Sequence, residues 1–157
     1  MAAPPLTAAA AIDAAPFSSV QKRIVFLCAM VAMLDGFDTQ AIAFVAPVVA
    51  IQWGIPVAAF GAVFGAGLAG LMVGALVFGP LADRYGRRRI TIATTALFGV
   101  LTLLTAWADS IGMLLALPFL TGLALGGAMP NIIALTAEFP PARSRATMVS
   151  LMFCGFP

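Results

Sequence analysis

Residues 60–89 read FGAVFGAGLAGLMVGALVFGPLADRYGRRR, an apolar run followed at once by a cluster of arginines. The run from Phe60 to Phe78 contains no charged side chain. A helix rises about 1.5 Å per residue, so about 20 such residues cross the roughly 30 Å of hydrocarbon in a bilayer. The stretch therefore predicts a membrane-spanning helix that ends at a charged connection.

Similar apolar runs lie on both sides of this stretch. They cover Ile24–Ala50, Ile90–Ala108 and Ile111–Ala137, and a fifth run begins at Ala146 and reaches Pro157. None shows the alternation of polar and apolar residues that is typical of a membrane strand. We therefore predict an all-α membrane protein with four transmembrane helices and the start of a fifth.

The composition agrees with this fold class. Hydrophobic residues make up 62% of the 157 residues and charged residues 9%, against about 45–50% and about 25% in an ordinary globular domain. A soluble fold of this length could not bury so much apolar surface, which excludes a soluble enzyme, a disordered protein and a nucleic-acid-binding protein. There is no histidine, and Cys28 and Cys154 lie in separate apolar runs, so we predict no metal site and no cofactor.

The basic residues predict the orientation in the membrane. All eight Lys and Arg precede the first run or follow the second and fourth runs. Cytoplasmic connections are enriched in these residues, so we expect the connections 79–89 and 138–145 to face the cytoplasm and the spans to cross the inner (plasma) membrane. Residues 1–19 are expected to form a disordered cytoplasmic tail, and residues 20–157 the helical part. Ser18 and Gln21 resemble a capping box that opens the first helix.

A polar cluster, DGFDTQ at residues 35–40, interrupts the first run. Asp35 lies roughly 17 Å along the helix from the start of the run, near the middle of the bilayer. Asp38 follows one turn later on nearly the same face. A carboxylate at that depth costs about 2.5–3.5 kcal/mol, so we expect both acids, Thr39 and Gln40 to face the bundle interior or a wet cavity.

Two interpretations of this cluster are open. It bonds neighbouring helices together, or it is a proton or substrate site. Desolvation and a neighbouring like charge both favour the neutral form of a carboxyl group, so one Asp of the pair could take up and release a proton near neutral pH. Gly36 between the two acids would permit local unwinding or close approach of a substrate.

Pro130 and Asn131 in the fourth run also have two interpretations. They could break the helix and turn the Asn131 amide toward the cavity, as in transporters with discontinuous helices, or they could mark a packing kink. In the second connection, Pro80 and Gly86 are expected to bracket a tight turn. Its arginines form either a plain membrane-surface anchor or, with Asp83, a charge latch.

Small residues predict where helices pack closely. The second run carries them at a spacing of four, and the fourth run carries a similar pair. Such patterns let helix backbones approach each other in lipid. The residues are Ala62, Ala66, Gly70, Gly74, Gly122 and Gly126.

Several segments together resemble one family. GPLADRYGRRR, residues 79–89, is similar to the signature connection between helices two and three of the major facilitator superfamily. DGFDTQAIAFVAP, residues 35–47, resembles the first-helix motif of its aromatic acid:proton symporter family. FLTGLALGGAMPNIIALTAEFPPARSRA, residues 119–146, and LMFCGFP, residues 151–157, resemble the fourth and early fifth helices. The resemblance covers nearly the whole chain after about residue 16.

The resemblance implies import of a small aromatic carboxylate, such as a hydroxybenzoate, together with a proton. It implies that Asp35 and Asp38 are the acidic pair needed for transport, beside which we place Gly36, Thr39, Gln40 and Asn131. It also implies a conformational-switch connection, for which we predict the residues Gly79, Asp83, Arg84, Gly86, Arg87, Arg88 and Glu138. Glu138 would pair with an arginine of this connection and lock the cytoplasmic side, or is a helix-end charge that reaches toward water.

One position departs from the family pattern. The family usually carries an Arg just before the Phe-Leu-Thr-Gly stretch, where this sequence has Pro118. No Lys or Arg lies within any predicted span, so these spans offer no counter-charge to an anionic substrate.

The resemblance further implies that the chain is part of the amino-terminal six-helix half of a major facilitator fold. Its partners would be the substrate, the proton, membrane lipid and the missing carboxy-terminal half, without which it should not transport. Two alternatives are open: a truncated membrane product without transport activity, or a carrier of another substrate such as a sugar or a metabolite acid. An enzyme is not expected, because no nucleophile and base pair is present.

Overall fold

The computed structural model describes residues 18–138 and 140–156, and the expected tail at residues 1–17 lies outside them. The described chain is helical and contains no strand. Its elements are α2 (Ser19–Trp53), η1 (Val57–Ala59), α3 (Phe60–Tyr85), α4 (Arg87–Thr105), α5 (Ile111–Glu138) and α6 (Ala142–Phe153). Helices α2, α3 with η1, α4 and α5 are long and apolar enough to cross a membrane. This confirms the predicted fold class of four spanning helices and a shorter fifth.

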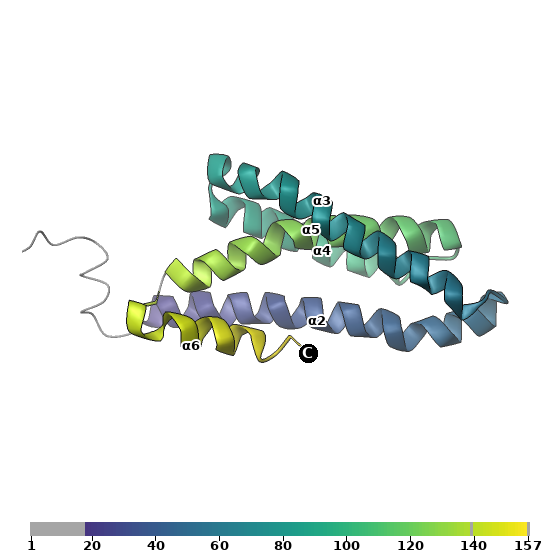
Figure 1. Cartoon of the computed structure of the whole chain (residues 1–157), viewed down its shortest axis with the longest axis horizontal. Coiled ribbons are helices and arrows are strands. Elements are labelled where there is room, and N and C mark those ends of the chain that lie inside the picture. Colours follow the sequence, from purple (N-terminus) through teal and green to yellow (C-terminus); the bar gives the residue numbers. More distant parts are fainter. Residues whose placement is uncertain (1–17, 139, 157) are drawn as a thin grey trace, which may run out of the picture.

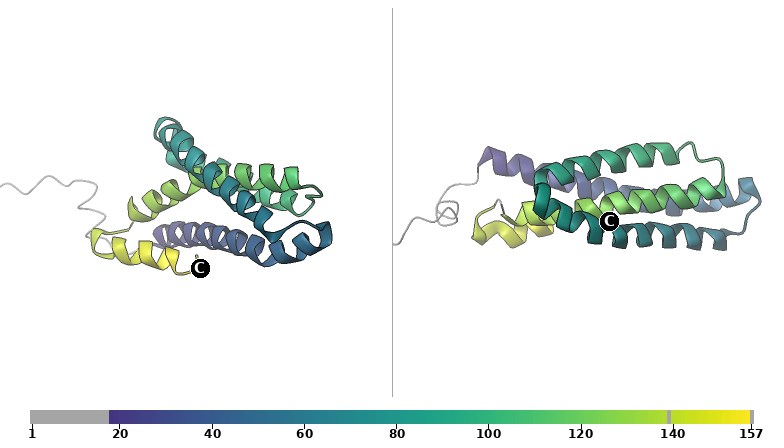
Figure 2. Two further views of the ribbon diagram at one scale, coloured as in Figure 1. Left: turned by 45° about the vertical axis from the view of Figure 1, so that its right-hand side comes forward. Right: turned by 90° about the horizontal axis from the view of Figure 1, so that it is seen from above.

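Helix α5 is the centre of the bundle. It lies between α3 and α4, and α2 and α6 form a second layer beside it (Figures 1 and 2). Helix α5 contacts each of α2, α3, α4 and α6. In the most apolar 18-residue stretch of α5, 50% is buried inside the bundle. The corresponding stretches of the other three candidate spans are 17–28% buried. The remaining helices therefore present most of their apolar surface outward.

Local sequence signals fix both ends of α2. The Ser18 hydroxyl accepts from the Val20 amide at 3.3 Å, and the Ser18 amide donates to the Gln21 side chain at 2.8 Å. This capping box confirms the predicted start. Gly54 ends the helix in the left-handed region, with φ of 63°, a conformation that favours glycine.

Glycines bring the backbones of α3 and α5 into direct contact, as the spacing of small residues predicts. A Cβ built on Gly70 or Gly74 would overlap the carbonyl oxygens of Phe119 or Leu123. A Cβ on Gly122 would in turn overlap the backbone of α3. Close approach of this kind is the main source of helix association in lipid, because lipid tails are as apolar as the side chains they replace.

The prolines do not interrupt the helices. Pro80 lies within α3, and Pro118 and Pro130 lie within a continuous α5. The prediction that Pro80 and Gly86 bracket a turn is therefore wrong, as is a helix broken at Pro130. Neighbouring helices shield the backbone groups that proline leaves free, so membrane helices tolerate it. The connection between α3 and α4 is reduced to Gly86, whose φ of 97° is accessible to glycine.

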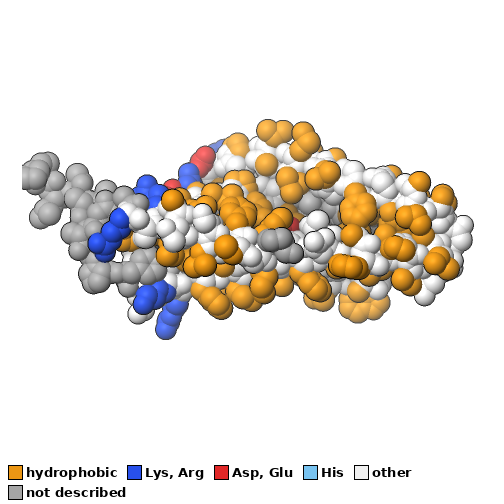
Figure 3. Space-filling model, turned by 60° about the horizontal axis from the view of Figure 1, so that its bottom comes forward, with side chains coloured by type: hydrophobic (Ala, Val, Ile, Leu, Met, Phe, Trp, Pro, Cys, Tyr) orange, Lys and Arg blue, Asp and Glu red, His pale blue; other side chains and the backbone are white. Residues whose placement is uncertain are grey.

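The charged and apolar surfaces are sorted as lipid requires. Figure 3 shows Lys and Arg gathered at the end of the bundle where α2 begins, and apolar side chains covering the flank. Phe44 is 80% exposed and Leu76 is 76% exposed, while Asp35 is 4% exposed. An outward apolar flank with an inward acid is the reverse of a soluble protein, and it matches a bundle surrounded by lipid.

The contact between α3 and α5 can be tested with paired glycine substitutions. Gly74→Ala should lower the free energy of unfolding by about 1–3 kcal/mol, because the added methyl group meets the backbone of α5. Gly65→Ala, on the same helix with nothing within 4 Å of an added Cβ, should be neutral or stabilising by up to about 1 kcal/mol. Denaturation of the purified chain in detergent micelles, followed by circular dichroism, measures both. Equal effects would contradict this packing.

Candidate functional site

The two acids of α2 lie in a pocket between α2, α3 and α5. Asp35 is buried and Asp38 is half-buried. The cavity has a volume of about 230 Å³. Its lining residues are Asp35, Asp38, Thr39 and Ile42 from α2, Val63, Phe64, Gly67, Leu68 and Leu71 from α3, and Pro118, Thr121, Gly122 and Leu125 from α5. The predicted interior position of both acids is therefore what the structure shows.

The chemistry of this pocket is an apolar wall facing two carboxyl groups. Phe64, Leu68 and Leu125 offer the kind of surface on which a small apolar ring packs. No Lys or Arg is among the lining residues. Two ionised carboxylates at this depth without a cation would be costly, so the pocket suits a group that exchanges protons.

The other residues predicted around the acidic pair are only partly brought together. Thr39 lines the pocket and its hydroxyl donates to the Asp35 carbonyl at 3.1 Å. Gln40 is exposed and is not a lining residue. Gly36 faces the segment that follows α6, where an added Cβ would overlap the carbonyl oxygen of Phe156. The helix is continuous at Gly36, so it is not locally unwound there. The group that approaches Gly36 closely is the neighbouring backbone of Phe156.

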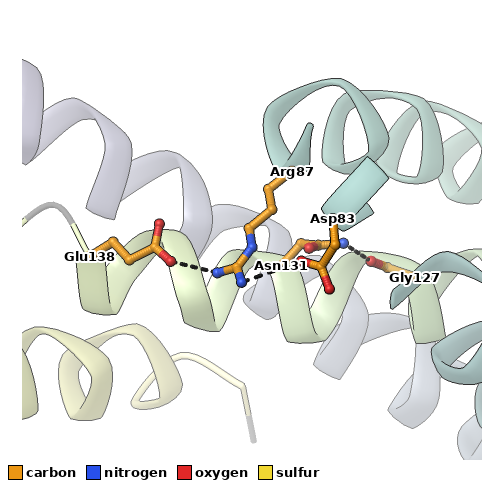
Figure 4. A network of polar contacts seen from close by, with 5 residues as sticks. All are labelled: Asp83, Arg87, Gly127, Asn131 and Glu138. Atoms are coloured by element: carbon orange, nitrogen blue, oxygen red, sulfur yellow. Dashed lines mark hydrogen bonds and ion pairs between the residues drawn. The ribbon is translucent and has the colours of Figure 1, made fainter. Parts of the chain in front are cut away.

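Asn131 lies apart from the acidic pair. It is buried, and its amide donates to the Gly127 carbonyl of its own helix at 2.7 Å (Figure 4). It is not among the residues that line the pocket. The Asn131 amide thus finds its hydrogen-bond acceptor within α5, because the helix is continuous and places the Gly127 carbonyl within reach.

The sequence did not single out Thr102 of α4. Its hydroxyl oxygen is buried and has no hydrogen-bond partner among the described residues. Thr102 is one of five threonines in α4, and nothing in its local sequence distinguishes it.

A second polar group lies at the end of the bundle that carries the basic residues. Arg87, at the start of α4, donates to Glu138 at 2.5 Å and to Asp83 at 3.5 Å, and so joins α3, α4 and α5 (Figure 4). The predicted pairing of Glu138 with an arginine of the second connection is confirmed. The side chains of Arg87, Asp83 and Glu138 are 38%, 70% and 58% exposed. We call these three residues the Arg87 cluster.

The remaining residues of the predicted switch connection surround this cluster without joining it. Arg84 lies over the ring of its neighbour Tyr85, at 5.7 Å from the ring centroid. Arg88 lines a separate groove between α2, α4 and α5. Gly79 has open space where a Cβ would be, whereas Gly86 makes the turn described above. Within residues 18–138 and 140–156, no group of three or more Asp, Glu and Cys is placed to hold a metal ion.

Four helices long and apolar enough to span a membrane, with a pair of acids in a pocket between them, indicate the class: a multi-pass membrane protein. The model of the Major Facilitator Superfamily matches residues 28–157. The chain belongs to this superfamily, whose members are transporters rather than enzymes.

Relatives of the chain carry names of aromatic acid transporters, which confirms the predicted resemblance. The 4-hydroxybenzoate transporter PcaK of Pseudomonas aeruginosa is 49% identical over 92% of this chain and 32% of its own length. The gallate transporter of Pseudomonas putida is 43% identical over 92% and 32%. The 3-(3-hydroxy-phenyl)propionate transporter of Escherichia coli is 47% identical over 83% and 32%. The chain thus spans about a third of the length of these relatives, and no solved structure matches it.

The exposure of the Arg87 cluster predicts that its ion pairs are weak. Arg87→Gln should lower the free energy of unfolding by less than about 1 kcal/mol, and by less still in high salt, as for other exposed ion pairs. Chemical denaturation in micelles at low and high salt measures this. Arg89→Gln is the matched control, because Arg89 has no ion pair within the described part of the chain. A loss above about 2 kcal/mol at Arg87 would indicate a buried, dominant contact instead.

Proposed function

We propose that this chain is the amino-terminal part of a transporter that imports small aromatic carboxylates, such as hydroxybenzoate, together with a proton. The observation that carries the proposal is the acidic pair, Asp35 and Asp38, held in an apolar pocket without a cation. The relatives named above supply the substrate class, since their names refer to hydroxylated benzoates and a phenylpropionate. No catalytic role is proposed for any residue.

The pocket suggests how protons and substrate are coupled. With Asp35 or Asp38 ionised, a substrate carboxylate meets a like charge in a medium of low dielectric, where repulsion is strong. Proton uptake by the pair removes this repulsion, so that the carboxylate can enter with its ring against Phe64 and Leu68. Release of the substrate and of the proton on the cytoplasmic side returns the pair to its first state. Pro118 stands in the pocket wall where the family usually has an arginine, so this wall offers no positive charge to the substrate carboxylate. We propose that the bound protons, or other parts of the transporter, compensate the negative charge instead.

The Arg87 cluster is proposed to bias the conformational change. An alternating-access transporter exposes its site to each side in turn, and a cluster that joins α3, α4 and α5 at one end favours one of these states. Gly79, Arg84, Gly86 and Arg88 are proposed to act with it.

The orientation and the division of the chain also belong to the proposal. Residues 1–19 would form a cytoplasmic tail, and residues 20–157 would be part of the first six-helix half in the inner membrane. Membrane lipid and the carboxy-terminal half would be the other partners. Another substrate of the superfamily, such as a sugar or a metabolite acid, is the alternative, and competition with unlabelled compounds distinguishes the two.

Asp38→Asn in the full-length protein that contains this chain tests the coupling. Asn has nearly the same shape but cannot exchange a proton, so uptake of labelled 4-hydroxybenzoate driven by a proton gradient should fall at least about tenfold, a factor that needs only about 1.4 kcal/mol. Asp109→Asn removes an exposed acid from the α4–α5 connection and should leave uptake unchanged. Undiminished proton-driven uptake by the Asp38 variant would refute the role of the pair.

The orientation can be tested with single cysteines. In a background with Cys28 and Cys154 replaced by serine, Gln52→Cys should react with a membrane-impermeant maleimide on intact cells. Arg143→Cys should react only after the cells are permeabilised, because it lies at the basic end. The reverse pattern would place the amino terminus outside.

A further inference from the structure

The pocket between α2, α3 and α5 is unusual in the kind of hydrogen bonding that its walls offer. Its polar side chains are Asp35, Asp38, Thr39 and Thr121. The Thr39 hydroxyl donates to the Asp35 carbonyl at 3.1 Å. The Thr121 hydroxyl donates to the Leu117 carbonyl at 2.8 Å. A hydroxyl group has one proton, so both threonines have used theirs and their oxygens can only accept further bonds. An ionised carboxyl group also only accepts.

The rest of the pocket wall adds no donor among the described residues. The side chains of the other lining residues carry no polar atom; they are Ile42, Val63, Phe64, Gly67, Leu68, Leu71, Pro118, Gly122 and Leu125. All of them lie within α2, α3 or α5, and these helices are continuous there. Backbone amides inside a helix donate to the carbonyl one turn earlier, so they are not available to a ligand. With both acids ionised, the walls that this chain contributes therefore present acceptors alone.

These acceptors fit one end of a hydroxylated aromatic acid better than the other. A carboxylate only accepts hydrogen bonds, so at this wall it would meet the oxygens of Thr39 and Thr121 with no proton between them. Buried acceptors that are left without a donor destabilise the complex. A ring hydroxyl has a proton to donate and can also accept, so it fits whether the two acids are ionised or protonated.

Thr121 is better placed than Thr39 to select for such a hydroxyl. It comes from α5, whereas the other polar side chains of the pocket come from α2. Thr121 is 4% exposed, while Thr39 is exposed. Water does not readily replace a ligand at a buried acceptor, so a ligand without the matching donor loses affinity there.

We propose that this pocket binds the hydroxyl-bearing end of the aromatic acid and that Thr121 is a specificity-determining residue, whose oxygen accepts the hydrogen bond from the ring hydroxyl. The ring then packs on the apolar wall of α3, at Phe64 and Leu68. The carboxylate points away from the acidic pair, toward parts of the transporter outside this chain, and still interacts with the charge of the pair through a medium of low dielectric. The proposal rests on the proposed function, because it concerns the same pocket and the same class of substrate.

Binding of substituted benzoates to the purified full-length protein that contains this chain tests the orientation. Labelled 4-hydroxybenzoate is displaced by unlabelled 4-hydroxybenzoate, 4-aminobenzoate or 4-fluorobenzoate, which share the carboxylate and differ in the group opposite it. The amino group can donate a hydrogen bond, so its affinity should stay within about threefold of that of 4-hydroxybenzoate. The fluorine cannot donate, so 4-fluorobenzoate should bind about tenfold more weakly. Equal affinities of 4-hydroxybenzoate and 4-fluorobenzoate would overturn the proposal.

Variants of Thr121 locate the contact. Thr121→Val keeps the shape and removes the acceptor, so the affinity for 4-hydroxybenzoate should fall about three- to tenfold, while the affinity for 4-fluorobenzoate stays the same. Thr121→Ser keeps the hydroxyl and should retain the preference. Thr94→Val is the matched control and should change neither affinity, because Thr94 is also buried and donates to its own helix at 2.8 Å but does not line the pocket. If Thr121→Val does not fold, Thr121→Ala should show the same selective loss.

Uptake of 4-hydroxybenzoate with and without a proton gradient separates this proposal from the proposed function. If the preference for a donor depends on Thr121 but uptake does not depend on the gradient, the orientation stands and the proton coupling is wrong. If uptake is proton-driven while Thr121→Val weakens 4-hydroxybenzoate and 4-fluorobenzoate equally, the proposed function stands and the orientation is wrong. If none of the three aromatic acids binds, both are wrong.

Discussion

The cost of an ionised group in hydrocarbon governs where this chain places its polar side chains. The Lys and Arg lie at one end of the bundle, where their charges reach water, and the apolar flank is exposed. Asp35 and Asp38 are the acids at membrane depth within the described residues, and both are turned toward the interior of the bundle. Such placement is the expected response to a penalty of about 2.5–3.5 kcal/mol per charge. A protein that accepts this penalty twice on one helix face needs a compensating use for the two groups, and proton exchange provides one.

The lipid surroundings also explain why glycines, rather than large side chains, lie where α5 packs against α3. Lipid does not drive apolar surfaces together as water does, so association depends on close contact. Gly122 on α5 and Gly74 on α3 let two backbones meet directly. That contact fixes the wall of the pocket, since Gly122 and Pro118 are on the face that looks at the acids. The backbone contact between α3 and α5 and the proposed site therefore use the same face of α5. Gly122 belongs to both.

The sequence was sufficient for features that depend on one segment at a time. Apolar length predicts the spans, basic residues predict which ends lie together, and the capping box at Ser18 follows from local pattern. The pairing of Glu138, which joins two helices, was expected from the family resemblance instead. Other features that depend on how the helices pack were not accessible. The Asn131 amide bonds to its own helix because Pro130 does not break it. Gly36 admits the backbone of Phe156.

The weakness of the Arg87 cluster is compatible with a role in switching. A contact that must form and break in every cycle cannot be worth many kcal/mol, because the state it stabilises would then be rarely left. Side chains that are 38–70% exposed keep each ion pair near the lower end of the range for salt bridges. Such pairs shift an equilibrium between two states by a modest factor and leave both states populated. The buried acidic pair is different, because in low dielectric a single proton changes its interactions far more than an exposed ion pair does. In the proposed transport cycle, the larger free-energy change would thus belong to the step that binds substrate and proton, and the cluster would only adjust the balance between the states that this step connects.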